Sequence, residues 1–162
     1  MPAIILAALV ALAATGRSAA ERVDCDLPEA CLAWFDASPA SHPAKLKALV
    51  DFMAAHERDE QRWKAAQGAI RHAAAAGASM VPDWQRRALD VDESSAVRIA
   101  ALRGLEGLGP HGVAARERIA PLANDEDPEI RAAARAALAA FDAPDVTVPA
   151  DATPPAEAHA VR

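Results

Sequence analysis

The chain has 162 residues and a formal net charge of −6, which leaves room for one modest domain with appendages. Alanine supplies 45 of the residues, whereas there are three phenylalanines and no tyrosine, so helix formers far outnumber strand formers. The composition therefore predicts an all-α fold, and the acidic balance argues against nucleic-acid binding, which depends on clustered lysines and arginines.

Residues 1–20 have the composition of a signal peptide. The stretch 3–14 is uncharged and mostly alanine, leucine, isoleucine and valine, and Ser18-Ala19-Ala20 supplies small residues for a signal peptidase. These 12 residues are too few to cross a bilayer, which takes about 20. We expect a periplasmic or secreted product that begins at Glu21, has a net charge of −7 and does not insert into a membrane. Because no lysine or arginine precedes the apolar stretch, an uncleaved anchor is the alternative.

Residues 21–43 are predicted to form a cysteine-bearing leader and linker. In an oxidising compartment, Cys25 and Cys31 are most simply explained as a disulfide. A metal or redox site is the alternative, but the spacing is not C-x-x-C and no histidine lies within ten residues of either cysteine. Pro28 is expected to begin a short helix, and residues 36–44 to form a connector rich in proline and serine.

A helical body is predicted at residues 44–141, and it repeats at an interval of 33 residues. Under this shift the amphipathic stretch 97–108 falls on 130–141, with apolar and arginine positions in the same places. Ser94 and Asp127 precede the two stretches as good N-caps. Each stretch is therefore expected to be one helix of a pair that stacks on the neighbouring pair.

A first helix is predicted before each of these stretches. Residues 82–89 and 111–122 fill that place, and the second of them should kink or end at Pro121. A third and looser pair is predicted at 45–56 and 60–76. Three units are about the minimum for a stable stack of this kind.

The turn aspartate, the Val-Arg or Ile-Arg opening and the run through Ala-Ala to leucine resemble the short bacterial HEAT-like (PBS-lyase-type) repeat. The segments DESSAVRIAALRGLEGLG and DEDPEIRAAARAALAAF carry this pattern, which covers residues 80–141 and, more loosely, 45–76. The resemblance implies a short α-solenoid of about three helix pairs that binds other proteins along its surface. It also implies that arginines reach turn acids of the same or the adjacent unit to stack the repeats, the residues being Asp92, Arg98, Asp125 and Arg131.

The sequence gives no pattern for catalysis or metal binding. It lacks G-x-S-x-G, H-x-x-x-H and H-E-x-x-H. The acidic turns at 90–93 and 124–129 could suggest calcium, but they lack the twelve-residue calcium loop and are explained as helix caps. We therefore expect no catalytic residue, no cofactor and no metal.

The residues expected to contact a partner are Arg103, Glu106 and Arg135, on the second helices of two units. Residues 44–141 carry 14 basic and 14 acidic side chains, so no basic field supports steering, and purely solvated arginines are the alternative. The predicted function is an exported, non-catalytic scaffold or adaptor for an unknown protein or peptide.

Two other functions stay open at this point. One is an enzyme accessory, such as the HEAT-like lyases that attach chromophores, which would need a ligand pocket. The other is a membrane-tethered spacer, if residues 1–20 are retained. Residues 142–162, with four prolines and several acids, are predicted to be a disordered tail.

Overall fold

The computed structural model describes residues 23–144. The predicted signal peptide at 1–20 and all but the first three residues of the predicted tail at 142–162 lie outside the described residues. Within the described part the chain is helical, which confirms the all-α prediction there. Its helices are α1 (Pro28–Ala37), α2 (His42–Ala55), α3 (Glu60–His72), α4 (Ala74–Gly77), α5 (Val81–Leu89), α6 (Ser95–Leu108), α7 (Arg116–Ile119) and α8 (Pro128–Ala140).

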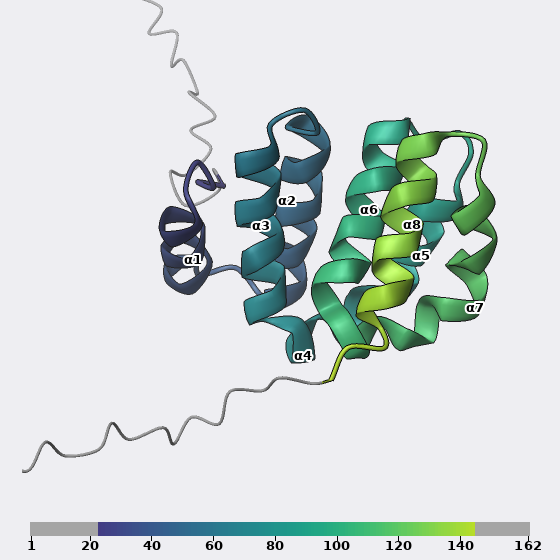
Figure 1. The fold of residues 1–162 in the computed structure, drawn as a ribbon. Coiled ribbons are helices and arrows are strands. Elements are labelled where there is room, and N and C mark those ends of the chain that lie inside the picture. Colours follow the sequence, from purple (N-terminus) through teal and green to yellow (C-terminus); the bar gives the residue numbers. More distant parts are fainter. Residues whose placement is uncertain (1–22, 145–162) are drawn as a thin grey trace, which may run out of the picture.

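The helices form a row of stacked pairs, as expected of a helical solenoid (Figure 1). The pairs are α2 with α3, α5 with α6, and the short α7 with α8, while α1 lies against α3 at the N-terminal end. Helix α6 is central, because it packs against α2, α3, α5 and α8. Each pair thus hides apolar surface against the next pair.

Small residues bring α6 close to its neighbours. A Cβ atom at Gly104 would lie only 2.9 Å from Cε3 of Trp84 and 3.0 Å from Cγ2 of Val50. At Gly107 the nearest atom to such a Cβ would be Cγ2 of Ile70, at 3.0 Å. The fully buried Trp84 ring therefore fills the space between α5 and α6, and the chain builds this core with few large side chains.

The caps predicted before the two repeated helices are present. The Ser94 hydroxyl accepts a hydrogen bond from the N–H of Val97, and the Asp127 carboxylate accepts from the N–H groups of Glu129 and Ile130. These contacts satisfy backbone donors that the first turn of a helix leaves free.

Residues 111–122 do not form the single helix that we predicted. A 3-10 helix, η3 (Gly109–Ala115), leads into the four-residue α7, and a second one, η4 (Ala120–Asn124), follows. Pro121 supplies no N–H, which works against continuing the α-helix there. Gly112 makes room for the Phe141 ring, because a Cβ atom added at this position would lie 2.5 Å from Cε1 of Phe141. The 3-10 helices thus let the backbone pass close to the Phe141 side chain at the end of the last pair.

Two further boundaries differ from the predictions. The stretch predicted at 60–76 is divided after α3, and α4 continues through the 3-10 helix η2 (Ala78–Met80) into α5. The connector is shorter than 36–44, because α1 reaches Ala37 and α2 begins at His42 with Pro43 in its first turn. The leader is therefore joined closely to the helical body.

Candidate partner-binding groove

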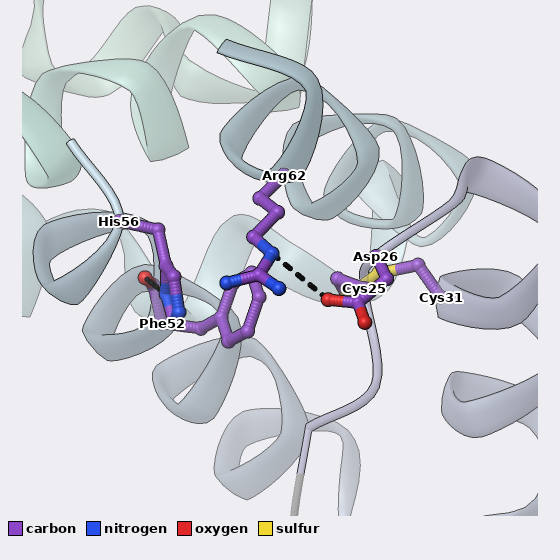
Figure 2. The surroundings of a disulfide bond; sticks show 6 residues. All are labelled: Cys25, Asp26, Cys31, Phe52, His56 and Arg62. Atoms are coloured by element: carbon purple, nitrogen blue, oxygen red, sulfur yellow. Dashed lines mark hydrogen bonds and ion pairs between the residues drawn. A yellow bond between two sulfur atoms is a disulfide. The ribbon is translucent and has the colours of Figure 1, made fainter. Parts of the chain in front are cut away.

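The cysteine-bearing leader contains a disulfide that closes a loop within it, and polar contacts hold this loop to α3 (Figure 2). Cys25 and Cys31 are joined as predicted, and both are fully buried. Between them, the Asp26 carboxylate lies 2.8 Å from Nε of Arg62, and the Asp26 carbonyl accepts a hydrogen bond from Nε2 of Gln61. The leader thus covers the N-terminal end of the stack.

The two repeat arginines, Arg98 and Arg131, donate hydrogen bonds to the turn before α8, where the second and third pairs meet. Nη2 of Arg98 donates to Oδ2 of Asp125 at 3.1 Å, and its Nε donates to the Ala88 carbonyl at 3.1 Å. Nη1 of Arg131 donates to the carbonyl oxygens of Asp125 and Glu126. Arg98 therefore links the end of α5 to the turn of the next unit.

Asp90, rather than Asp92, takes the position equivalent to Asp125. The Asp90 carboxylate accepts from the N–H of Asp92 at 3.0 Å, just as Asp125 accepts from the N–H of Asp127. Asp92 itself is exposed. The turn before α6 is two residues longer than the turn before α8, so a fixed shift of 33 residues aligns the caps but misaligns these acids.

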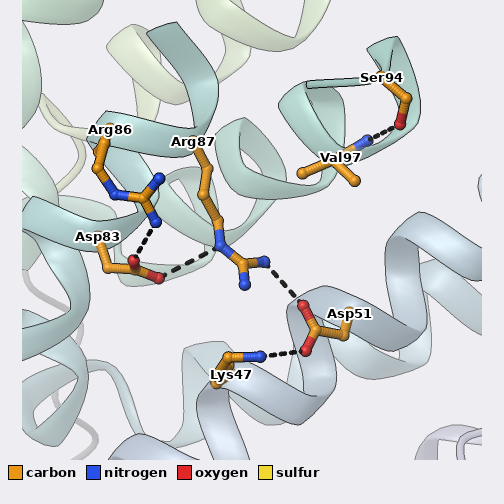
Figure 3. Close-up of polar contacts among 7 residues, drawn as sticks. All are labelled: Lys47, Asp51, Asp83, Arg86, Arg87, Ser94 and Val97. Atoms are coloured by element: carbon orange, nitrogen blue, oxygen red, sulfur yellow. Dashed lines mark hydrogen bonds and ion pairs between the residues drawn. The ribbon is translucent and has the colours of Figure 1, made fainter. Parts of the chain in front are cut away.

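A second polar cluster joins α2 to α5 and was not predicted from the sequence (Figure 3). Nη1 of Arg87 lies 2.7 Å from Oδ1 of Asp51, whose other oxygen pairs with Lys47. Burial raises the pKa of Asp51, but hydrogen bonds from Lys47 and Arg87 outweigh it and leave that pKa below its ordinary value. Asp83 pairs with both Arg86 and Arg87. This cluster bridges the first two pairs.

A groove of about 510 Å³ runs between α3, α6 and α8, and we call it the Trp63 groove. Alanines of α8 form one wall, and charged side chains surround the opening. Its lining residues are Glu57, Arg58, Trp63, Arg103, Glu106, Glu129, Ala132, Ala133 and Ala136.

Arg103 lies in this groove with its guanidinium group stacked on the indole of Trp63, 3.8 Å from the ring centroid. Its Nη1 atom is buried and has no hydrogen-bond partner among the described residues. Burial lowers the pKa of Arg103, although Glu106 and Glu129 act in the opposite direction. The groove thus contains a cation–π pair and a donor without an acceptor.

The structure brings together two of the three predicted partner contacts. Arg103 and Glu106 both line the Trp63 groove. Arg135 does not line it, and its Nε donates to the Ala123 carbonyl at 3.0 Å. Trp63 was not among the predicted partner-binding residues, because its stacking on Arg103 depends on how α3 packs against α6.

Among residues 23–144, no group of three or more histidine, cysteine, aspartate or glutamate side chains is placed to hold a metal ion. None of the described helices has the length and apolar character of a membrane-spanning helix.

Residues 81–150 match the family model for HEAT repeats, a range that spans α5 to α8. Residues 81–150 are therefore similar to HEAT repeats, which supports the HEAT-like prediction for this part of the chain. HEAT repeats generally mediate contacts between proteins, and they suggest protein partners for this HEAT-like chain as well. Neither the curated proteins nor the solved structures contain a match to it.

Proposed function

We propose that this HEAT-like protein is an exported, non-catalytic scaffold or adaptor that binds a partner protein in the Trp63 groove. The observation that carries the proposal is the stacked pair of Trp63 and Arg103 at the junction of three helices. Tryptophan and arginine are the residues most often responsible for binding energy in protein interfaces. A groove between successive units is also where a stacked array offers a continuous surface.

Unpaired polar groups in the groove support the same proposal. Glu106 and Glu129 make no ion pair within 4.0 Å in the described residues, and Nη1 of Arg103 has no acceptor. The groove offers both acceptors and a cation, so a partner segment with mixed polar groups matches it better than a nucleic acid does. Binding of such a segment would give Nη1 of Arg103 an acceptor and would replace water at the two glutamates.

Export is proposed from two features. Residues 1–20 have the composition of a signal peptide, and the buried disulfide of Cys25 and Cys31 is typical of a protein folded in an oxidising compartment. Mass spectrometry of the mature protein should find Glu21 at its N-terminus. A mature chain that retains residues 1–20 would instead favour the membrane-tethered spacer.

The binding proposal is tested by affinity capture from the native cell envelope with charge-reversal variants. Arg103→Glu should lose the partner, because it removes the cation–π pair and adds a fourth carboxylate beside Glu57, Glu106 and Glu129. Arg118→Glu is the matched control, since Arg118 is an exposed arginine of α7 that does not line the groove. Recovery of the same proteins with both variants and with the unaltered chain would reject this site.

A further inference from the structure

The Trp63 groove contains three polar side chains that its own residues leave unpaired. Glu57 and Arg58 pair with each other at 3.8 Å, which accounts for one acid and one base of the lining. The other charged side chains are Arg103, whose buried Nη1 has no acceptor, and two glutamates. Neither Glu106 nor Glu129 makes an ion pair among the described residues. The groove therefore offers one donor and two carboxylates to a ligand.

These three side chains lie close together where α6 packs against α8. Glu106 follows Arg103 by three residues on α6, a spacing that places two side chains on the same face of a helix. Burial lowers the pKa of Arg103, and the charges of Glu106 and Glu129 raise it, so both carboxylates lie near the guanidinium group. A ligand group that fits this arrangement must offer an acceptor and a donor over a short distance.

The charges of the groove argue against an ionised ligand group. The lining carries three glutamates and two arginines, a net charge of −1 (2 minus 3). A carboxylate would accept from Arg103 but would lie against Glu106 and Glu129, and like charges held this close repel each other. An ammonium group would balance the net charge, but it would leave Nη1 of Arg103 without an acceptor. An uncharged group that both accepts and donates avoids both costs.

A carboxamide is the uncharged group whose hydrogen-bonding atoms match the groove. The side chain of asparagine or glutamine has a carbonyl oxygen that accepts and an NH2 group that donates twice. Nη1 of Arg103 lacks one acceptor, and Glu106 and Glu129 supply two. A main-chain peptide group fits less well, because it has a single N–H and, in the planar trans form, its C=O and N–H point in opposite directions.

We propose that the partner places an asparagine or glutamine side chain in the Trp63 groove. Its oxygen accepts from Arg103, and its NH2 group donates to Glu106 and Glu129. This inference rests on the proposed function, because it names the group that the partner presents to the same groove. Such a contact gives specificity, since a site built to hydrogen-bond a polar group rejects analogues that lack it.

NMR titration of the full chain with five short peptides tests the proposal. Each peptide has five residues, all alanine except the central one, which is glutamine, asparagine, glutamate, lysine or leucine. The peptides are acetylated and end in an N-methylamide, so that the central side chain is the one place for a primary amide. The glutamine or the asparagine peptide should bind at least about tenfold more tightly than the three others. The shifted signals should include the Nε–H of Arg103 and the indole N–H of Trp63.

Glu129→Lys tests the role of the carboxylates. Glu129 is exposed in the first turn of α8, so the variant should fold, which circular dichroism checks. The lining then carries two acids and three bases, and the glutamate peptide should become the tightest binder. Glu126→Lys is the matched control, because Glu126 is an exposed glutamate of the turn before α8 that does not line the groove. It should keep the order of affinities of the unaltered chain.

Three results would overturn the inference. They are equal affinity for all five peptides or binding of none, tightest binding of the glutamate, lysine or leucine peptide, and an unchanged order of affinities in Glu129→Lys. The capture experiment with Arg103→Glu stays independent of them. Loss of the native partner there, without a preference for the amide peptides here, would keep the groove as the partner site and reject the carboxamide.

Discussion

The junction between the first two helix pairs and the junction between the last two are held in different ways. At the first, Gly104 lets the Trp84 ring and Val50 approach closely, and the Asp51–Arg87 ion pair bridges the surface above. At the second, the Arg98–Asp125 pair is only 12% and 18% exposed and joins the ends of two units. Both junctions bury apolar side chains, and they differ in the polar contact: the carboxylate of the first ion pair is 46% exposed, whereas that of the second is 18% exposed.

The difference follows from the sequence of the first unit. Aligning Trp63 with Val97 places Lys64 at the position of Arg98. Lys64 pairs with Glu60 in the same helix instead of reaching the next unit. Asp90 is present at the equivalent position of the next turn, so the first junction lacks this contact because lysine replaces the repeat arginine, not because the aspartate is missing.

Trp84→Ala should have the largest effect, because it empties the core of the first junction. Trp84 is 0% exposed, and truncation of such a tryptophan costs about 3–5 kcal/mol of unfolding free energy. Urea unfolding followed by circular dichroism measures it. A loss below about 1 kcal/mol would mean that the first junction does not depend on this ring.

Gly104→Ala should also destabilise the first junction, although alanine is the better helix former. The added methyl group would lie 2.9 Å from the Trp84 ring, and such overpacking costs about 1–3 kcal/mol. Gly107→Ala should cost less, because its methyl group would meet only aliphatic atoms of Ile70, at 3.0 Å, and of Gln67, at 3.4 Å. Thermal unfolding of the two variants gives the comparison, and equal stability of both with the unaltered chain would contradict it.

At the second junction, Arg98→Ala should lower stability by about 1.5–3 kcal/mol, the range for hydrogen bonds to charged groups. Arg98→Lys should not restore it, since one ammonium group cannot replace both the Nε and the Nη2 contact. A double-mutant cycle with Asp125→Ala measures the coupling. Additive losses would show that the two side chains do not stabilise each other.

Asp51→Asn should have the smallest effect, at most about 1 kcal/mol at neutral pH, because the pair lies at the surface. The pKa of Asp51 is below its ordinary value in the folded chain, so its contribution is present above the unfolded pKa of about 3.9. It is lost as the pH falls through the folded pKa. Unfolding measured against pH should therefore bring the variant and the unaltered chain together in acid, and a constant difference would contradict this.

The sequence predicts those parts of the molecule that depend on neighbouring residues. The helices at 97–108 and 130–141 follow from apolar spacing, and their caps at Ser94 and Asp127 from residue type. Cys25 and Cys31 are close enough along the chain to pair without knowledge of the fold. The HEAT-like match over residues 81–150 agrees with this reading.

Contacts that depend on three-dimensional crossing could not be predicted. The stacking of Arg103 on Trp63 joins residues 40 positions apart and requires the actual packing of α6 on α3. The position of Asp90 was missed because two extra turn residues interrupt the period. The prediction of one helix at 111–122 was wrong because the apolar spacing suits a helix, whereas Gly112 and Pro121 favour tighter turns.

The Arg98–Asp125 contact also bears on how such a chain can lengthen. Its two members are 27 residues apart and fall within one 33-residue period, the arginine near the beginning and the aspartate near the end. A tandem duplication of residues 95–127 would therefore give each new copy both members, already spaced to meet. Growth of the rod by gene duplication would then need no new side chains at the added junction.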